Sequence, residues 1–157
     1  MSDAEKVAMA RQATLAPHAK AAAKLAQACL EESVRYAQQR HTFGKPIGAR
    51  QAIAFAISDL AVAVEAARTL TYKAAWLKDA GRSAKEVKHA AAIAKLFSSE
   101  AAVSATRVAT QVFGGYGFME EYPVARFYRD AKILEIGEGT SEVQRMVIAR
   151  SLGLPVE

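Results

Sequence analysis

Two glycine clusters near the C-terminus contain the residues whose types and spacing could do chemistry. Gly114-Gly115-x-Gly117 and Gly137-x-Gly139 bracket a charged stretch in an otherwise alanine-rich sequence. The second cluster places one carboxylate, Glu138, between two residues that have no side chain. Glycine allows the backbone to approach a ligand closely, and a helix that only packs has no need of an acid held in this way.

The carboxylate of Glu138 could act as a base beside a carbonyl group. It precedes a helix predicted to begin near Thr140, could reach a substrate carbon without obstruction, and its backbone N–H could donate to a ligand oxygen. This pairing suits abstraction of a proton next to a carbonyl. The alternative is a simple turn in which the acid favours the helix dipole, and the tetrapeptide alone favours this alternative.

The first glycine cluster forms the motif Gln111-x-x-Gly114-Gly115. Backbone N–H groups beside paired glycines can contact a phosphate or a ribose, although a glycine pair after a helix is more often a C-cap. The motif is not a G-x-G-x-x-G fingerprint that follows a strand, so the sequence does not predict a Rossmann site.

A third candidate is the loop Arg40-His41-Thr42-Phe43-Gly44. An arginine, a hydroxyl group and an aromatic ring on one tight loop would suit the phosphates and the ring of a dinucleotide. The alternative is a loop that Phe43 fastens to the core while Arg40 is solvated, and the local sequence favours it.

The remaining polar groups favour structural roles. Arg126-x-x-Arg129-Asp130 is typical of a salt-bridge network. The histidines at positions 18, 41 and 89 have no metal-ligand spacing, so we expect no metal site. No Ser/His/Asp or Cys/His arrangement is visible. The single cysteine, Cys29, lies in an apolar stretch and is expected to be a small buried residue.

Composition limits the class of protein. The chain has 157 residues, of which 52% are hydrophobic, and these values predict a single globular domain. Its net charge of +5 would suit an anionic ligand. Without a run of Lys and Arg, nucleic-acid binding is not expected. No apolar run approaches a membrane span, and no secretion signal is visible. With one cysteine, these features predict a cytoplasmic protein.

Hydrophobic spacing predicts helices throughout the chain. Four main helices are expected over about residues 3–39, 50–79, 85–113 and 140–152, with Pro17 kinking or dividing the first. The connection 116–137 has room for a short helix over about residues 124–130, and long ordered connections tend to be functional. No segment has a strand period. The sequence therefore predicts an all-α protein, an antiparallel four-helix bundle.

Three finer predictions concern helix surfaces and ends. Phe55, Val62 and Leu70 widen the apolar face of the second helix, which would suit a bundle or an oligomer interface. The lysines of the third helix are expected to be solvated, namely Lys85, Lys88 and Lys95. Thr140 or Ser141 is expected to cap the last helix, and Ser141-x-x-Gln144 matches a capping box.

Taken in order, these segments resemble the C-terminal domain of the acyl-CoA dehydrogenase family over about residues 20–153. Each motif is unspecific alone, but the ordered set is highly specific. The matching motifs are Tyr36-Ala-x-x-Arg40-x-x-Phe43-Gly44-x-Pro46-Ile47, Gln51, Ala94-Lys95, Ser99-Glu100-Ala101, Gln111-Val-Phe-Gly-Gly-Tyr-Gly117, Glu121-Tyr-Pro-Val, Tyr128-Arg-Asp-Ala-Lys-Ile133 and Glu138-Gly-Thr-Ser-Glu-Val-Gln-Arg145.

The resemblance implies a helical bundle that closes over FAD together with a central β domain and a neighbouring subunit's bundle. It implies that Glu138 is the catalytic base and that Gly139 lies against the acyl-CoA thioester. The implied FAD contacts are Arg40, Thr42 and Gln51, Phe43 near the adenine end, Gln111, Gly114 and Gly115 on the adenosine and pyrophosphate of the partner's FAD, and Thr140 and Glu142 near the flavin.

The implied reaction is α,β-desaturation of an acyl-CoA, with electrons passing to an electron-transfer flavoprotein. The family associates through this domain, so a homodimer or homotetramer is expected. The family's N-terminal helical and central β domains are not in this sequence, and the chain alone is expected to be inactive unless a second chain supplies them. The alternative is a non-catalytic helical module for oligomerisation or for partnering a larger subunit.

The sequence departs from the family's pattern near its start. Gln12 and Leu15 stand where the family usually has an Asp and an Arg that help to bind CoA. Some members place the base on the first helix, but the equivalent residue, Thr14, has no carboxylate, so Glu138 remains the better candidate. Gly137 replaces a tyrosine that many members carry before the base, while others tolerate glycine.

Overall fold

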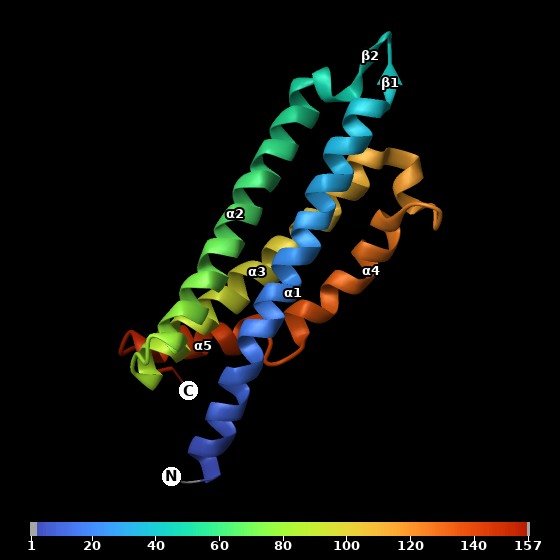
Figure 1. Cartoon of the computed structure of the whole chain (residues 1–157). Helices are drawn as coiled ribbons and strands as arrows, with labels where there is room; N and C mark the ends of the chain where they lie inside the picture. The colour runs from blue at the N-terminus through green and yellow to red at the C-terminus, as the bar shows by residue number, and fades with distance from the viewer. Residues whose placement is uncertain (1–2, 157) are drawn as a thin grey trace.

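The computed structural model describes the backbone of residues 3–156 and the side chains of residues 17–156. Within this part of the chain, three long helices lie along one another: α1 (Asp3–Gln39), α2 (Gln51–Asp79) and α3 (Ala84–Phe113). The shorter α4 (Pro123–Ile136) runs back against α1 and α3, and α5 (Ser141–Ser151) packs on α3 at the lower end of Figure 1. The predicted all-α bundle is confirmed.

Two details of the helices differ from prediction. The first helix is not divided at Pro17, because α1 continues through this residue as one helix. The connection after α3 contains much more helix than the 124–130 segment that was expected. A 3-10 helix, η2 (Gly114–Phe118), is followed by the 14-residue α4, which begins with Pro123. Proline suits the first turn of a helix, since its missing N–H would have no partner there.

A small hairpin joins α1 to α2. Strands β1 (His41–Thr42) and β2 (Lys45–Pro46) pair antiparallel, and the 3-10 helix η1 (Ile47–Ala49) leads into α2. At its tip, Phe43 and Gly44 have φ values of 52° and 75°. Strands of two residues are too short to show an alternating pattern, which is why the sequence did not predict them.

Alanine dominates the interface between the long helices. Small side chains allow helix backbones to approach closely, so a core can form with few large residues. The main cluster also includes aromatic rings: Tyr36 of α1 stacks on Phe113 of α3 with ring centroids 4.0 Å apart, and Tyr122 packs edge-on against both. Its buried members are Ala22, Ala26, Cys29, Leu60, Val64, Ala102, Ala105, Ala109, Phe113 and Val124.

Hydrogen-bonding caps fix the starts of α3 and α5. Ser83 and Glu86 form a capping box at α3 that was not predicted. At α5 the N-cap is Thr140, whose hydroxyl accepts from the Val143 N–H. Ser141 is already helical, so the predicted capping box on Ser141 and Gln144 is wrong.

The outer face of α2 exposes large apolar side chains. Phe55, Val62, Tyr72 and Trp76 are all exposed, although Phe55 and Val62 were expected to widen the packed face. The side of α2 that carries them faces away from α1 and α3. The buried residues Leu60, Val64 and Ala67 are on the opposite side, which packs against those two helices. Within residues 3–156, no helix combines the length and apolar content that a membrane crossing would need.

Candidate functional site

The turn between α4 and α5 carries Glu138 in an unusual backbone conformation. Glu138 has φ 56° and Gly139 has φ 95°, both in the left-handed region. A residue other than glycine held there costs roughly 1–3 kcal/mol, so the surrounding structure must impose this conformation. The Glu138 side chain is exposed. We call residues 135–139 the base loop.

Glycines flank Glu138 for two different reasons. A Cβ on Gly139 would lie 2.8 Å from Nε2 of Gln144, and φ at this position already favours glycine. A Cβ on Gly137 would lie 3.0 Å from Nε2 of His18 on α1 and 3.2 Å from the Ile133 carbonyl oxygen. His18 therefore lies in the space that a tyrosine before the base would need.

Lys95 of α3 lies beneath the base loop and is only 1% exposed. Its Nζ donates to the carbonyl oxygens of Gly139 at 2.7 Å and Glu135 at 3.2 Å. The prediction that Lys95 is solvated is wrong. Ala91 and Ser99, one helical turn to either side of Lys95, lie on the same face of α3 and are also buried.

The charged group of Lys95 is buried, with carboxylates nearby. Burial lowers the pKa of the Lys95 ammonium group, and the nearby carboxylates of Glu135, Glu142 and Glu100 oppose this shift. Since the ammonium donates to two neutral carbonyl oxygens, its hydrogen bonds organise backbone rather than forming an ion pair.

Gln144 of α5 also holds this turn. Its buried Nε2 donates to the carbonyl oxygens of Glu138 at 3.3 Å and Gly139 at 3.2 Å. Gln144 Oε1 and Ser141 Oγ are buried, and among the described residues no hydrogen-bond partner reaches either atom. Buried polar atoms are normally paired, so the start of α5 has hydrogen-bonding capacity left for a further group.

The other residues predicted at this end are Thr140 and Glu142. Thr140 caps α5, and the pKa of the exposed Glu142 carboxyl is lowered, chiefly by the Thr140 hydroxyl. The structure thus places the carboxylate of Glu142, the hydroxyl of Thr140 and the exposed Glu138 around the N-terminus of α5.

A second group of predicted residues comes together at the other end of the bundle. Arg40 and Thr42 line one cavity of about 610 Å³ together with Gly114 and Gly115, which lie some seventy positions later in the sequence. A Cβ added at either glycine would meet no atom within 4 Å, so the backbone there faces open space. The Arg40 guanidinium lies 5.8 Å from the centre of the Tyr116 ring. We call this cavity the cradle.

Phe43 lies at the tip of the hairpin and is 94% exposed. The Arg50 guanidinium lies 5.6 Å from its ring centre, and Arg50 donates to the Thr42 carbonyl oxygen at 3.2 Å. The alternative in which Phe43 fastens the loop to the core is therefore wrong. The ring is instead presented outward, where another molecule could contact it.

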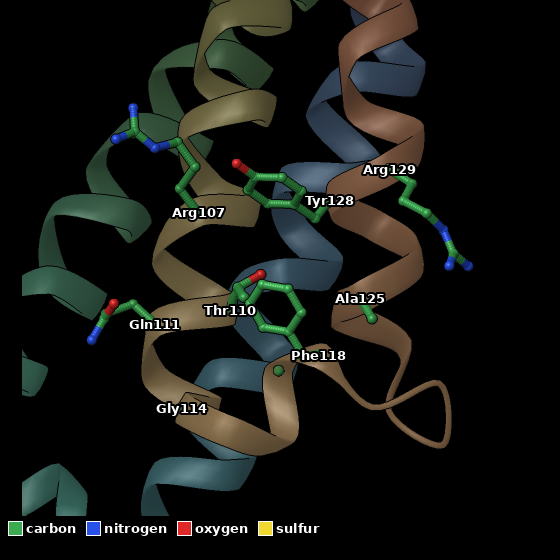
Figure 2. A pocket seen from close by; sticks show the side chains of 9 residues that line it. Arg107, Thr110, Gln111, Gly114, Phe118, Ala125, Tyr128 and Arg129 are labelled. Carbon is green, nitrogen blue, oxygen red and sulfur yellow. The ribbon is translucent and has the colours of Figure 1, made fainter.

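Neither Gln111 nor Gln51 lines the cradle. Gln51 is the exposed first residue of α2 and does not line that cavity. Gln111 lines an adjacent cavity of about 570 Å³ between α3, η2 and α4. In Figure 2 its side chain points away from α4, whereas the Phe118 ring lies beside Thr110 and the Tyr128 side chain extends from α4 toward α3.

The base loop and the cradle lie at opposite ends of α4 (Figure 1). A helix of 14 residues is about 21 Å long, so one compact pocket of this chain cannot contain both groups. The structure therefore joins Arg40, Thr42, Gly114 and Gly115 in one site, and Glu138, Gly139, Thr140 and Glu142 in another.

Three further predictions concern the arginines of α4, the start of the first helix and metal binding. Arg129 forms an exposed ion pair with Glu120, across the turn before α4. The side chains of Gln12, Thr14 and Leu15 lie outside the described residues. Among the residues that the structure describes, no cluster of His, Cys, Asp and Glu could hold a metal ion.

Known proteins of one family are similar to this chain in sequence. The family model for the acyl-CoA dehydrogenase C-terminal domain matches residues 8–153. A probable acyl-CoA dehydrogenase of Bacillus subtilis, YngJ, is 54% identical over 129 residues, which are 82% of this chain and 33% of the relative. The mitochondrial short-chain specific acyl-CoA dehydrogenase of Rattus norvegicus is 49% identical over 128 residues, 82% of this chain and 30% of the relative.

Solved structures show the same relationship. Butyryl-CoA dehydrogenase from Megasphaera elsdenii matches with a TM-score of 0.89 and 46% identity, over 92% of this chain and 37% of that chain. A chain in a structure of the electron transferring flavoprotein of Acidaminococcus fermentans matches at 0.90 and 40% identity, over 93% and 38%. The FAD complex of PigA matches at 0.79 and 34% identity, over 83% and 33%.

These matches cover most of this chain but only part of each relative. The chain spans about a third of the length of the curated relatives it matches. Because the family model matches nearly the whole sequence, from residue 8 to residue 153, the chain belongs to the acyl-CoA dehydrogenase family and corresponds to its C-terminal domain.

Proposed function

We propose that this chain is the base-carrying domain of an FAD-dependent acyl-CoA dehydrogenase, which desaturates an acyl-CoA thioester between its α and β carbons. The observation that carries the proposal is the conformation of Glu138. An exposed acid stands in a left-handed turn between two glycines, and Lys95 and Gln144 hold the carbonyl groups of that turn. The names of the relatives support the same reaction class.

Glu138 would remove the proton from the α carbon of the thioester. An exposed carboxylate on a fixed turn can meet a substrate carbon at one distance and angle, which general-base catalysis requires. Gly139 has no side chain, so the thioester can lie directly against the turn. Backbone N–H groups of this turn would donate to the thioester oxygen, on which negative charge develops as the proton leaves.

The residues present fit FAD at both ends of the molecule. In the cradle, the Arg40 guanidinium, the Thr42 hydroxyl and the open backbone at Gly114 and Gly115 suit a pyrophosphate. Phe43 on the exposed hairpin tip and Gln111 in the adjacent cavity would contact the adenosine, and Gln51 at the start of α2 would also contact FAD. Near the base, Thr140 and Glu142 would face the flavin. FAD, when bound, supplies the acceptor for the hydride that leaves the β carbon.

The separation of the two sites supports an assembly of at least two copies. Since the cradle and the base loop lie at opposite ends of α4, the cradle would hold the FAD whose flavin lies beside a neighbouring copy's base. A homodimer or homotetramer is therefore part of the proposal. The proposal also includes an electron-transfer flavoprotein as electron acceptor and a cytoplasmic location. It further includes an additional segment or second chain that supplies the other two thirds of the enzyme.

A chimera tests this proposal. The part of Megasphaera elsdenii butyryl-CoA dehydrogenase that precedes its match to this chain is joined to this chain. We expect a yellow protein that reduces an artificial electron acceptor with butyryl-CoA, whereas the 157-residue chain alone stays colourless and inactive. Arg40→Ala in the chimera should weaken FAD retention at least about 10-fold, because a charge-assisted contact to phosphate is lost.

Arg35→Ala is the matched control for the Arg40 variant. Arg35 is an exposed arginine on the last turns of α1 that pairs with Glu32, and its removal should leave FAD retention unchanged. Equal FAD loss in both variants, or a chimera that folds but never binds FAD, would contradict the proposal.

A non-catalytic module is the second candidate, and the exposed apolar side of α2 favours it. A helix face of this kind can serve association without any chemistry. A chimera that binds FAD and assembles, yet turns over no acyl-CoA while the parent enzyme does, would favour this reading.

A further inference from the structure

Lys95 is a buried charge that takes no direct part in the proposed chemistry. It is among the largest fully buried side chains of the described residues. Burying an ammonium group is costly, and a buried charge commonly stabilises a fold less than an apolar side chain of similar size would. Packing alone therefore does not account for a lysine at this position.

The two partners of Lys95 bracket the base. Its ammonium group donates to the Glu135 carbonyl oxygen, three residues before Glu138, and to the Gly139 carbonyl oxygen, one residue after it. One buried donor group thus ties the last turn of α4 to the entrance of α5. The segment between these two anchors is the part of the chain that carries the left-handed Glu138.

Gln144 completes this arrangement from α5. Its amide nitrogen donates to the Glu138 and Gly139 carbonyl oxygens, so the carbonyl groups of residues 135, 138 and 139 all accept from buried donors. Fixing a carbonyl group fixes the plane of its peptide bond, and hence the backbone torsion angles on either side. The strained φ of Glu138 is then maintained while its carboxylate remains on the exposed side.

We propose that Lys95 is a positioning residue, which holds the base loop so that Glu138 is presented to the substrate in one backbone conformation. This inference rests on the proposed function for its catalytic consequence, but its structural part can be measured without any activity.

The first measurement needs no variant. In the unsubstituted chain, NMR of the lysine side chains should show that the Lys95 ammonium protons exchange with water at least about 10-fold more slowly than those of Lys88, because only buried and hydrogen-bonded protons are protected. Lys88 is the exposed control on the same helix. Equally fast exchange at both lysines would overturn the inference.

The second measurement compares Lys95→Met with Lys88→Met in the chain itself. Methionine keeps the length of the side chain and removes its donors. In Lys95→Met the amide of Gly137, which donates to the Ile133 carbonyl oxygen, should exchange at least about 10-fold faster, while the amide of Ala67 in α2 stays unchanged. Lys88→Met should alter neither amide. Equal acceleration at both amides would assign Lys95 a general folding role and overturn the inference.

The third measurement uses the chimera. Lys95→Met should lower kcat at least about 10-fold and should change KM less than kcat, because the displaced base loop no longer presents Glu138 to the α carbon. Lys88→Met should leave both constants unchanged. If the chimera is active, Glu138→Gln abolishes turnover and Lys95→Met does not reduce kcat, the inference fails while the proposed function stands. If the unsubstituted chimera is inactive, the proposed function fails, and the exchange measurements still decide whether Lys95 holds the loop.

Discussion

Gly139 shows how tightly single residues around the base are specified. A residue with a side chain there would be strained by the left-handed backbone conformation. Its Cβ would also lie only 2.8 Å from Nε2 of Gln144. We expect Gly139→Ala to lower the free energy of unfolding by about 2–4 kcal/mol, from backbone strain and overpacking together. Urea denaturation measures this loss.

Gly153 is the control for the Gly139 variant. Its φ is 85°, but no atom lies within 4 Å of a Cβ built there. Gly153→Ala should therefore lose only the strain part, about 1–2 kcal/mol. Equal losses in the two variants would show that Gln144 does not restrict position 139.

Cys29 gives a prediction of pH dependence. Burial raises the pKa of the Cys29 thiol from 9.0 to about 12. Above pH 9 the unfolded thiol ionises while the folded thiol stays neutral, so stability that is fully present below pH 9 is lost as the pH rises toward 12. The loss approaches about 1.4 kcal/mol per pH unit.

The variant Cys29→Ala isolates this effect, because it removes the titrating group and leaves the others in place. Urea unfolding at about pH 8 and about pH 10.5 should show the wild-type chain losing roughly 1–2 kcal/mol more than the variant between the two conditions. Parallel losses in the two proteins would mean that the thiol is not shielded in the folded state.

At the scale of elements, the turn that follows α3 determines the cradle. A Cβ on Gly117 would lie 2.5 Å from the Thr110 carbonyl oxygen, so η2 packs directly on the last turns of α3. Gly117→Ala should lower the free energy of unfolding by about 1–3 kcal/mol, since the contact is to backbone that cannot move aside easily.

Gly115 in the same 3-10 helix provides the comparison, because a Cβ there meets nothing within 4 Å. Gly115→Ala should change stability by less than about 0.5 kcal/mol, while in the chimera it should weaken FAD retention if the cradle holds the pyrophosphate. A Gly115 variant that is as unstable as the Gly117 variant would contradict the packing described for η2.

The sequence predicted the long helices well, because their apolar spacing repeats over many turns and their ends are marked by glycine, proline or capping residues. It predicted α4 too short, since Arg126, Arg129 and Asp130 leave that helix with only a narrow apolar face. The hairpin was missed because two-residue strands have no period.

The candidate site was only partly readable from sequence. Glu138 and the cradle residues stand out through glycine clusters and the family motifs, which are local signals. Lysine side chains are usually exposed to solvent, so the sequence predicted an exposed Lys95. Its burial is decided instead by which segments pack over it in the fold. The contact of His18 with position 137 also depends on how α1 packs against the turn before α5.

At the scale of the whole molecule, the exposed side of α2 is the surface most in need of a partner. Phe55, Val62, Tyr72 and Trp76 recur at intervals that place them along one side of the helix. We expect the chain to sediment as a dimer or tetramer, and Trp76→Glu to shift it toward monomer without loss of helical content. Lys73→Glu, which changes charge beside this surface, should leave the assembly intact. Sedimentation of the unsubstituted chain as a monomer at high concentration would contradict this expectation.

The central claim is that Glu138 removes the α proton, and its most direct test is the rate at which butyryl-CoA bleaches the flavin of the chimera in anaerobic stopped-flow experiments. We predict that Glu138→Gln lowers this rate at least about 100-fold while FAD and substrate still bind, because the amide cannot accept the proton. Glu121→Gln, at an exposed acid before α4, should leave the rate unchanged. Flavin reduction at an undiminished rate in Glu138→Gln would contradict the account.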